Sequence, residues 1–339
     1  MYQNLTHFED YFLDVQRIPF VIAALFVTAV FGMITGPAWG NANPFVWNVL
    51  DVLFGRLGGR MDRSSRTPRD LKIRGLVFAL LLLLFALFIG RGLLELTLQS
   101  SAIEGLIVVL CLSTGSVWYM VLKLYFVLDK QGNTKGGYFG LARSSRVDLN
   151  SMDDYGIVRE GLAYSAISFD KGFVAPSLWY LIGGVPFLII YSVLAFGAWR
   201  FGKCGHTKGF GITFLVLERL LGFVPSVFSG LLYTATSVVA PSVRMADGFK
   251  AWWQGKDKAP YEQGGMILSA LAWPLGVSLG GPVRDIDGHY IKKEWVGPDG
   301  ASARVDAHHL RRGIIINVAA HLMFLLALLS AYIYAGRLF

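Results

Sequence analysis

Long apolar runs divide this chain and constrain its fold more than any other feature. They cover about residues 19–34, 75–98, 105–128, 173–199, 210–240, 266–281 and 313–335. Several approach or exceed the ~18 residues that indicate a membrane-crossing segment. A backbone in lipid must satisfy its own hydrogen bonds, so these runs are expected to be helices. The sequence predicts an all-α, polytopic membrane protein that forms one domain over residues 1–339.

Composition supports this class. The chain is 54% hydrophobic and only 16% charged, whereas soluble domains have about 25% charged residues. The net charge of +8 comes from basic residues in loops, which indicates membrane topology and not nucleic-acid binding. Cys111 and Cys204 are too few for a disulfide or zinc framework.

The distribution of basic residues predicts the orientation. Segment 55–74 is rich in arginine, so it is expected on the cytoplasmic side, as are segments 129–172 and 241–312. The N-terminus is then non-cytoplasmic. This scheme puts Arg200, Lys203 and Lys208 outside, against the usual trend.

Run 266–281 is the exception among the apolar runs. It is short, contains Pro274 and several glycines, and has basic segments on both sides. Irregular backbone at membrane depth is tolerated only inside protein or along a wet cavity. We therefore expect about six spans plus a re-entrant or protein-buried hairpin here.

Ionisable residues inside spans are costly and frequently functional. Glu218 and Arg219 lie near the middle of an apolar run, and adjacent positions point about 100° apart on a helix. Each therefore needs its own partner. The two residues either face a functional cavity or stabilise contacts between helices where Pro225 breaks the run. Asp170 and Lys171 precede the run at 173–199, which the sequence Gly183-Gly184-Val185-Pro186 interrupts.

The cytoplasmic side holds the best group of polar residues. Asp148 and Arg159 lie before the Gly183–Gly184 run, and Arg284 follows the Gly280–Gly281 break. Glycine lets a ligand approach the backbone, and Arg or Lys beside it suits a phosphate. We expect a wet cytoplasmic pocket where the two glycine-broken segments meet. The alternative is a basic flank whose ion pairs are satisfied.

Other motifs give weaker indications. His308 and His309 are adjacent and point to different faces, so no metal site is expected there. The stretch QGNTKGGYFG lacks the phosphate-loop pattern and is interpreted as a flexible loop.

Longer motifs resemble a known family. GFVAPSLWYLIGGVPFLIIY, PLGVSLGGP, WVG at 295–297 and NPFVWNVLDVLFGRLGGRMDR are similar, in this order, to the CobD/CbiB family of cobalamin biosynthesis. The resemblance extends from about residue 35 to 297. It implies an inner (plasma) membrane protein of bacteria.

The polar positions of the family pattern match less well. Its Asp in Gly-Asp-Pro falls on Gly36, its His on Asn43, its Glu-Asn on Ile167 and Ser168, and its next Asp on Lys171. The following Asn and Asp fall on Ala195 and Ala198, an Asp pair on Glu218 and Arg219, and a later Asn and Glu on Gln263 and Leu268.

The resemblance implies a reaction and a site. The family reaction is ATP-dependent amide formation between adenosylcobyric acid and aminopropanol or its phosphate, so ATP, Mg²⁺ and a corrinoid are the implied ligands. Candidate catalytic residues are Asp148, Asp170 and Glu218. Candidate ligand-binding residues are Arg159, Ser168, Lys171, Arg219, Gly280, Gly281 and Arg284.

Because most of the family's carboxylates are replaced, turnover stays open. The alternative is a non-catalytic paralogue that binds a ligand or partner, like the distantly related AmpE. A transporter is a third class, but no inverted repeat supports it.

Overall fold

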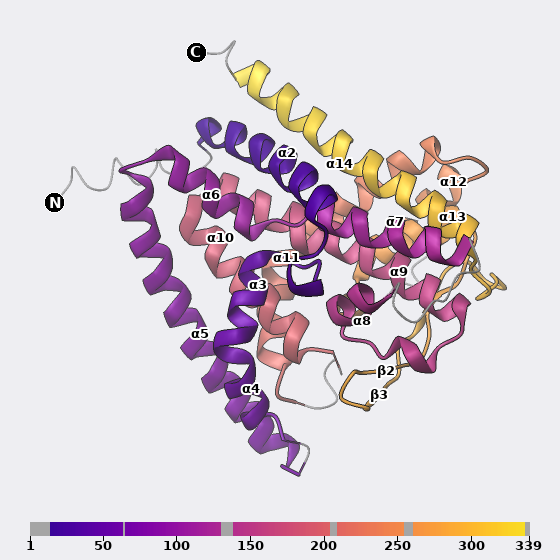
Figure 1. The fold of residues 1–339 in the computed structure, drawn as a ribbon, viewed down its shortest axis with the longest axis horizontal. Helices are drawn as coiled ribbons and strands as arrows, with labels where there is room; N and C mark the ends of the chain where they lie inside the picture. Colours follow the sequence, from indigo (N-terminus) through magenta and orange to yellow (C-terminus); the bar gives the residue numbers. More distant parts are fainter. Residues whose placement is uncertain (1–13, 64, 130–137, 204–208, 254–259, 336–339) are drawn as a thin grey trace.

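The computed structural model describes residues 14–63, 65–129, 138–203, 209–253 and 260–335. Cys204, Lys208 and most of the stretch QGNTKGGYFG lie outside these residues. Helices dominate, with four two-residue strands (Figure 1). The first half contains η1 (Val15–Arg17), α2 (Ile18–Thr35), η2 (Ala38–Gly40), α3 (Phe45–Leu50), η3 (Asp51–Gly55), α4 (Arg56–Met61), α5 (Pro68–Thr97), α6 (Ser101–Cys111), α7 (Gly115–Asp129), α8 (Phe139–Ser145), η5 (Leu149–Ser151), α9 (Asp154–Phe169) and η6 (Asp170–Val174). The second half contains α10 (Ala175–Phe201), α11 (Ile212–Thr236), η7 (Ser237–Val239), α12 (Met245–Trp253), η9 (Tyr261–Gln263), α13 (Gly265–Leu275), β1 (Leu279–Gly280), β2 (Val283–Arg284), β3 (Tyr290–Ile291), β4 (Trp295–Val296) and α14 (Ala307–Ala335).

Six helical segments among the described residues are long and apolar enough to cross a membrane, which confirms the predicted fold class. They are Val15–Thr35, Pro68–Thr97, Ser101–Asp129, Asp154–Phe201, Ile212–Val239 and Ala307–Ala335. Leu84 and Phe88 of α5 are 67% and 78% exposed, and such an apolar outer face is suited to contact with lipid.

The fourth span begins earlier than its apolar run. The Asp153 side chain accepts a hydrogen bond from the Gly156 backbone N–H and caps α9. The π-helical turn η6 then joins α9 to α10 without a break. Residues 154–172, which the loop charges placed in a cytoplasmic segment, are therefore part of a helical span.

Gly183 and Gly184 reverse the chain within α10. Both leave helical geometry, and Gly184 has φ 63° and ψ −156°. Tyr164 and Gly202 line the same cavity, and they are equally far from Gly183 along the chain. The same is true of Ser168 and Ala198. Residues 154–182 and 185–202 therefore form an antiparallel helical hairpin whose turn is the Gly-Gly pair.

The hairpin corrects the predicted position of the loop after α10. Lys203 forms an ion pair with Asp285 and donates to the Arg146 carbonyl oxygen. The predicted orientation placed Lys203 outside and both of its partners in the cytoplasm. Because Lys203 contacts both, all three lie on the same side, and the prediction that Lys203 lies opposite them is wrong. The scheme counted one crossing where the Gly-Gly turn makes the chain return.

Residues 277–305 form a polar layer that connects segments distant in sequence. β1 pairs with β4 and β2 pairs with β3, both antiparallel. Val147 bridges to Asp285, and the Asp148 backbone N–H donates to the Arg284 carbonyl oxygen. The layer thus fixes α8 and the start of α9 against the strands.

The short apolar run 266–281 begins with a helix that is buried in protein and continues into this layer. Its helix α13 has 11 residues, or about 16 Å at 1.5 Å per residue, which is too short for a ~30 Å hydrocarbon core. Residues 267–275 are all buried. They pack mainly on α11 and α12.

The Gly-Gly turn gives a first testable prediction. The φ and ψ of Gly184 lie in a region that only glycine adopts readily, so Gly184→Ala is expected to destabilise the protein by about 1–3 kcal/mol. Thermal unfolding in detergent measures this. Gly92→Ala is the matched control, because its added methyl group meets no atom within 4 Å in α5. Equal stability of the two variants would contradict the strained turn.

Candidate functional site

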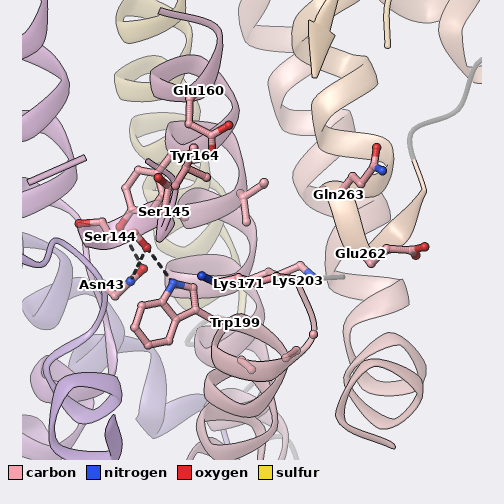
Figure 2. Close-up of a pocket in the computed structure, with 18 of the residues that line it drawn as sticks. Asn43, Ser144, Ser145, Glu160, Tyr164, Lys171, Trp199, Lys203, Glu262 and Gln263 are labelled. Atoms are coloured by element: carbon pink, nitrogen blue, oxygen red, sulfur yellow. Dashed lines mark hydrogen bonds between the residues drawn. The ribbon is translucent and has the colours of Figure 1, made fainter. Parts of the chain in front are cut away.

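A cavity of about 140 Å³ lies between the two arms of the helical hairpin. We call it the lysine cavity. Its wall comes from the segment around Asn43, α8, both hairpin arms and η9 (Figure 2). The polar layer adds Ile291 and Lys293. It is lined by Asn43, Trp47, Ser144, Ser145, Val147, Glu160, Tyr164, Ile167, Ser168, Lys171, Gly172, Ala195, Ala198, Trp199, Gly202, Lys203, Leu215, Glu262, Gln263, Gly264, Ile291 and Lys293.

Three lysines from three different elements line this cavity, and each has a carboxylate partner. Lys171 Nζ lies 2.9 Å from Glu218 Oε2, and Lys293 Nζ lies 2.8 Å from Glu160 Oε2. Lys203 pairs with Asp285. Because an ammonium has three N–H donors, each lysine can hold its carboxylate and still donate to a ligand.

Glu218 is the centre of a buried network behind the cavity. Its side chain is 0% exposed. Besides Lys171, it accepts hydrogen bonds from Tyr191 Oη at 3.2 Å and Tyr261 Oη at 2.8 Å. Lys171 Nζ also lies 4.2 Å from the centroid of the Tyr261 ring. These contacts fix the ammonium of Lys171 at the cavity wall.

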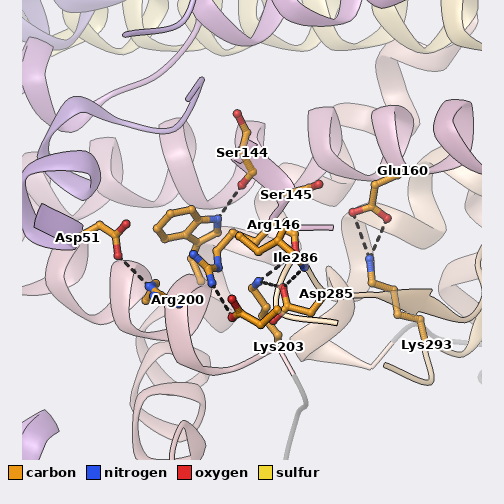
Figure 3. Close-up of polar contacts among 12 residues, drawn as sticks. Asp51, Ser144, Ser145, Arg146, Glu160, Arg200, Lys203, Asp285, Ile286 and Lys293 are labelled. Atoms are coloured by element: carbon orange, nitrogen blue, oxygen red, sulfur yellow. Dashed lines mark hydrogen bonds and ion pairs between the residues drawn. The ribbon is translucent and has the colours of Figure 1, made fainter. Parts of the chain in front are cut away.

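A second network holds Lys203 (Figure 3). Arg146 has a left-handed backbone, with φ 57°, and its Nη2 lies 3.2 Å from Asp287 Oδ2. Burial first, and then the nearby Arg146 guanidinium, lower the pKa of Lys203 to about 7, although Asp285 opposes both effects. Arg200 Nε lies 2.7 Å from Asp51 Oδ1, which ties the end of α10 to η3.

The wall opposite η9 is built from neutral polar groups around Ser144 (Figure 2). The Ser144 carbonyl oxygen accepts from Trp199 Nε1 at 2.7 Å and from Asn43 Nδ2 at 3.0 Å. Tyr164 Oη donates to Asn43 Oδ1 at 2.9 Å. Four segments therefore share one hydrogen-bonded wall, which gives the cavity a defined shape.

Of the predicted site residues, Ser168 and Lys171 line the cavity, and Glu218 lies directly behind Lys171. Asp170 is buried and faces α11, where Ser226 and Ser229 donate to its carboxylate. Glu218 and Arg219 were expected to have separate partners, but both contact Tyr261: Glu218 accepts from its hydroxyl group, and Arg219 lies over its ring. The exposed Arg219 guanidinium lies 6.0 Å from the Tyr261 ring centroid.

The remaining predicted residues lie away from the cavity wall. Asp148 caps η5 by accepting from the Asn150 backbone N–H. Arg159 donates to the Ala303 carbonyl oxygen and lies over the Trp295 ring at 5.4 Å. Arg284 is an exposed residue of β2.

The predicted meeting of the two glycine-broken segments is wrong. Gly183 and Gly184 form the hairpin turn, where the neighbouring Leu181 carbonyl oxygen accepts from Arg17 Nη1. Gly280 and Gly281 pack in the polar layer, where a Cβ atom would meet Glu294 or Trp295. None of the four lines the lysine cavity. The glycines serve a turn and a close strand pairing.

The sequence did not predict Lys203, Lys293 and Glu160 as site residues, because each lies outside any recognised motif. A signal did exist in the resemblance. Positions that match polar residues of the family pattern converge on this cavity: Asn43, Ile167, Ser168, Lys171, Ala195, Ala198 and Gln263. The sequence prediction did not use this signal, because it placed the cavity near Arg159, Asp170, Lys171 and the Gly280–Gly281 break, and of these only Lys171 lines it.

The chain matches the family model described as CobD/Cbib protein over residues 21–317. It is 27% identical over 277 residues to a protein of Rhizobium meliloti, covering 77% of this chain and 81% of the relative. It is 26% identical over 276 residues to one of Sinorhizobium fredii, covering 76% and 82%. A Brucella anthropi relative is 24% identical over 242 residues, covering 68% and 73%. All three are named "Cobalamin biosynthesis protein CobD". No solved structure gives a significant match.

Proposed function

The chain belongs to the CobD/CbiB family of cobalamin biosynthesis, and on this premise we propose that its lysine cavity binds a phosphate-bearing intermediate of that pathway. The observation that carries the proposal is the convergence of Lys171, Lys203 and Lys293 on one cavity. The proposed reaction is that of the family, ATP-dependent amide formation between a corrinoid carboxylate and the amine of aminopropanol or its phosphate, in which ATP activates the carboxylate and the departing oxygen leaves with phosphate.

The size of the cavity indicates which part of each substrate it holds. At about 140 Å³ it is smaller than the 300–1,000 Å³ of pockets that enclose drug-sized ligands. It suits the phosphate and amino alcohol, while a corrin ring would lie outside the wall formed by Glu262, Gln263 and Lys293. The ammonium groups would bind phosphate oxygens as charge-assisted donors.

Ser168 and Asn43 add neutral polar groups to the same wall. Glu218 acts through Lys171, which makes it a positioning residue in this proposal. Asp170 lies behind the hairpin arm and holds α11 through two serine hydroxyls, so no role toward substrate is assigned to it.

The implied ATP and Mg²⁺ fit this site unequally. The lysines offer donors for the phosphates of ATP. Mg²⁺ prefers carboxylate and other oxygen ligands, but Glu160 is already bound through both oxygens to Lys293. Within the described part of the chain, no group of three or more His, Cys, Asp or Glu side chains could hold a metal ion. Mg²⁺ therefore carries no step in the proposal.

Complementation tests the function. We expect the gene to restore growth on cobyric acid in a strain that lacks adenosylcobinamide-phosphate synthase. Lys203→Met/Lys293→Met should abolish that growth, because two of the three phosphate donors are lost. Lys250→Met is the control, since this lysine pairs with Asp247 on the exposed face of α12. Immunoblots of membranes establish equal protein levels. Absence of growth with wild-type protein at normal levels would reject catalysis.

A non-catalytic ligand-binding protein is the second candidate. Ala195 and Ala198 favour it, since both line the cavity at positions where the family pattern has Asn and Asp. It predicts that the purified protein binds aminopropanol phosphate without turnover. Calorimetry with aminopropanol and its phosphate, each with and without adenosylcobyric acid and ATP, separates the two candidates: turnover with all reactants supports the first, and phosphate-dependent binding without turnover supports the second.

A further inference from the structure

A second cationic pocket lies at the edge of two spans, remote in sequence from the hairpin. It has a volume of about 170 Å³ and is lined by Pro241, His308, Arg311, Arg312 and Ile315. We call it the basic rim pocket. The span that includes α11 and η7 ends at Val239, and the span of α14 begins at Ala307. The pocket therefore lies where two apolar helices reach the membrane–water boundary.

The charges of this pocket differ from those of the lysine cavity. There, each lysine has a carboxylate partner. Among the residues that the structure describes, Arg311 and Arg312 form no ion pair. The acidic residue at the start of α14, Asp306, is bound by His309 Nδ1 at 2.7 Å. Two guanidinium groups are thus available to an anion from outside the chain.

The surroundings show which kind of anion fits. Val238 and Val239 lie just before Pro241 and are 64% and 61% exposed. The adjoining helix α12 exposes Trp253 at 86% and Phe249 at 41%. Tryptophan beside exposed apolar residues is typical of the membrane interface. An occupant must therefore have an anionic head beside an apolar body.

We propose that the basic rim pocket binds the headgroup of an anionic phospholipid. The phosphate lies between Arg311 and Arg312, and the acyl chains extend along Val238 and Val239. Basic pockets between membrane helices bind anionic headgroups in this way. The proposal does not depend on the function of the lysine cavity.

The test measures lipid binding by protein purified in a neutral detergent. Native mass spectrometry compares phosphatidylglycerol with phosphatidylcholine of the same acyl chains. Two basic residues at about 1 kcal/mol each correspond to about 30-fold tighter binding of phosphatidylglycerol. Arg311→Gln/Arg312→Gln should remove this preference. Arg56→Gln/Arg60→Gln is the matched control, because both arginines are exposed on α4, and should keep it.

Two further arms complete the test. Arg311→Lys/Arg312→Lys retains the charge and should retain most of the lipid preference, which separates charge from folding defects. Inorganic phosphate at millimolar concentration should not displace the lipid. Equal binding of the two lipids by wild-type protein would overturn the proposal. So would retention of the preference by the glutamine variant, or displacement by inorganic phosphate, which would identify a free-phosphate site.

Discussion

Replacing Lys171 with Met is expected to lower the free energy of unfolding by about 3–5 kcal/mol, because it leaves the carboxylate of Glu218 buried without its cation. The side chains of this pair are only 12% and 0% exposed, so water cannot replace the lost ammonium. Chemical unfolding in detergent, followed by tryptophan fluorescence, measures the change.

The double variant Lys171→Met/Glu218→Gln separates lost charge compensation from lost packing. Its neutral amide can still accept from Tyr191 and Tyr261, so most of the stability should return. Lys250→Met is the control, since its exposed pair with Asp247 is worth about 0–1 kcal/mol. A Lys171→Met protein as stable as this control would show that the network around Glu218 does not depend on the ion pair.

The second large effect is on the pH dependence of anion binding to the lysine cavity. Because burial lowers the pKa of Lys203 to about 7, the empty protein loses this proton above pH 7. A bound anion favours the charged ammonium, so binding above pH 7 must take up a proton. The dissociation constant should therefore rise by up to about tenfold per pH unit above 7.

Sulfate is the probe for this experiment, since it does not titrate in this range. Calorimetry in buffers of different ionisation enthalpy reports the proton uptake. Arg146, Arg200 and Asp285 also act on Lys203, but Lys203→Met alone should remove the pH dependence, and Lys250→Met should keep it. An unchanged slope in Lys203→Met would assign the titration to another group.

The lowered pKa of Lys203 also affects the stability of the protein without a ligand. Between pH 7 and Lys203's ordinary value of 10.5, the unfolded chain binds more protons at this residue than the folded protein. Stability then rises with pH across this window. Lys203→Met should flatten that rise, which gives a readout of the shift without any ligand.

Local features of the sequence identified some of the site. Glu218 stood out because an ion inside an apolar run needs a partner, Lys171 because it lies at the entry to such a run, and Ser168 because of its place in a family motif. Lys203 and Lys293 are ordinary loop lysines by sequence. Only the contacts of the polar layer with the hairpin bring them to the cavity.

The sequence by itself determined that this chain is a helical membrane protein with six long apolar helical segments, because the length and apolarity of a run decide whether a helix can cross lipid. It also favoured a re-entrant or protein-buried segment at 266–281, of which residues 267–275 are buried, and it indicated the family. Only the tertiary structure decided that the Gly183–Gly184 break reverses the chain. The reason is that glycine permits many backbone conformations, and packing against α5 and the polar layer selects one of them. That selection returns Lys203 to the side of Asp285 and creates the cavity, which no local pattern of residues contains.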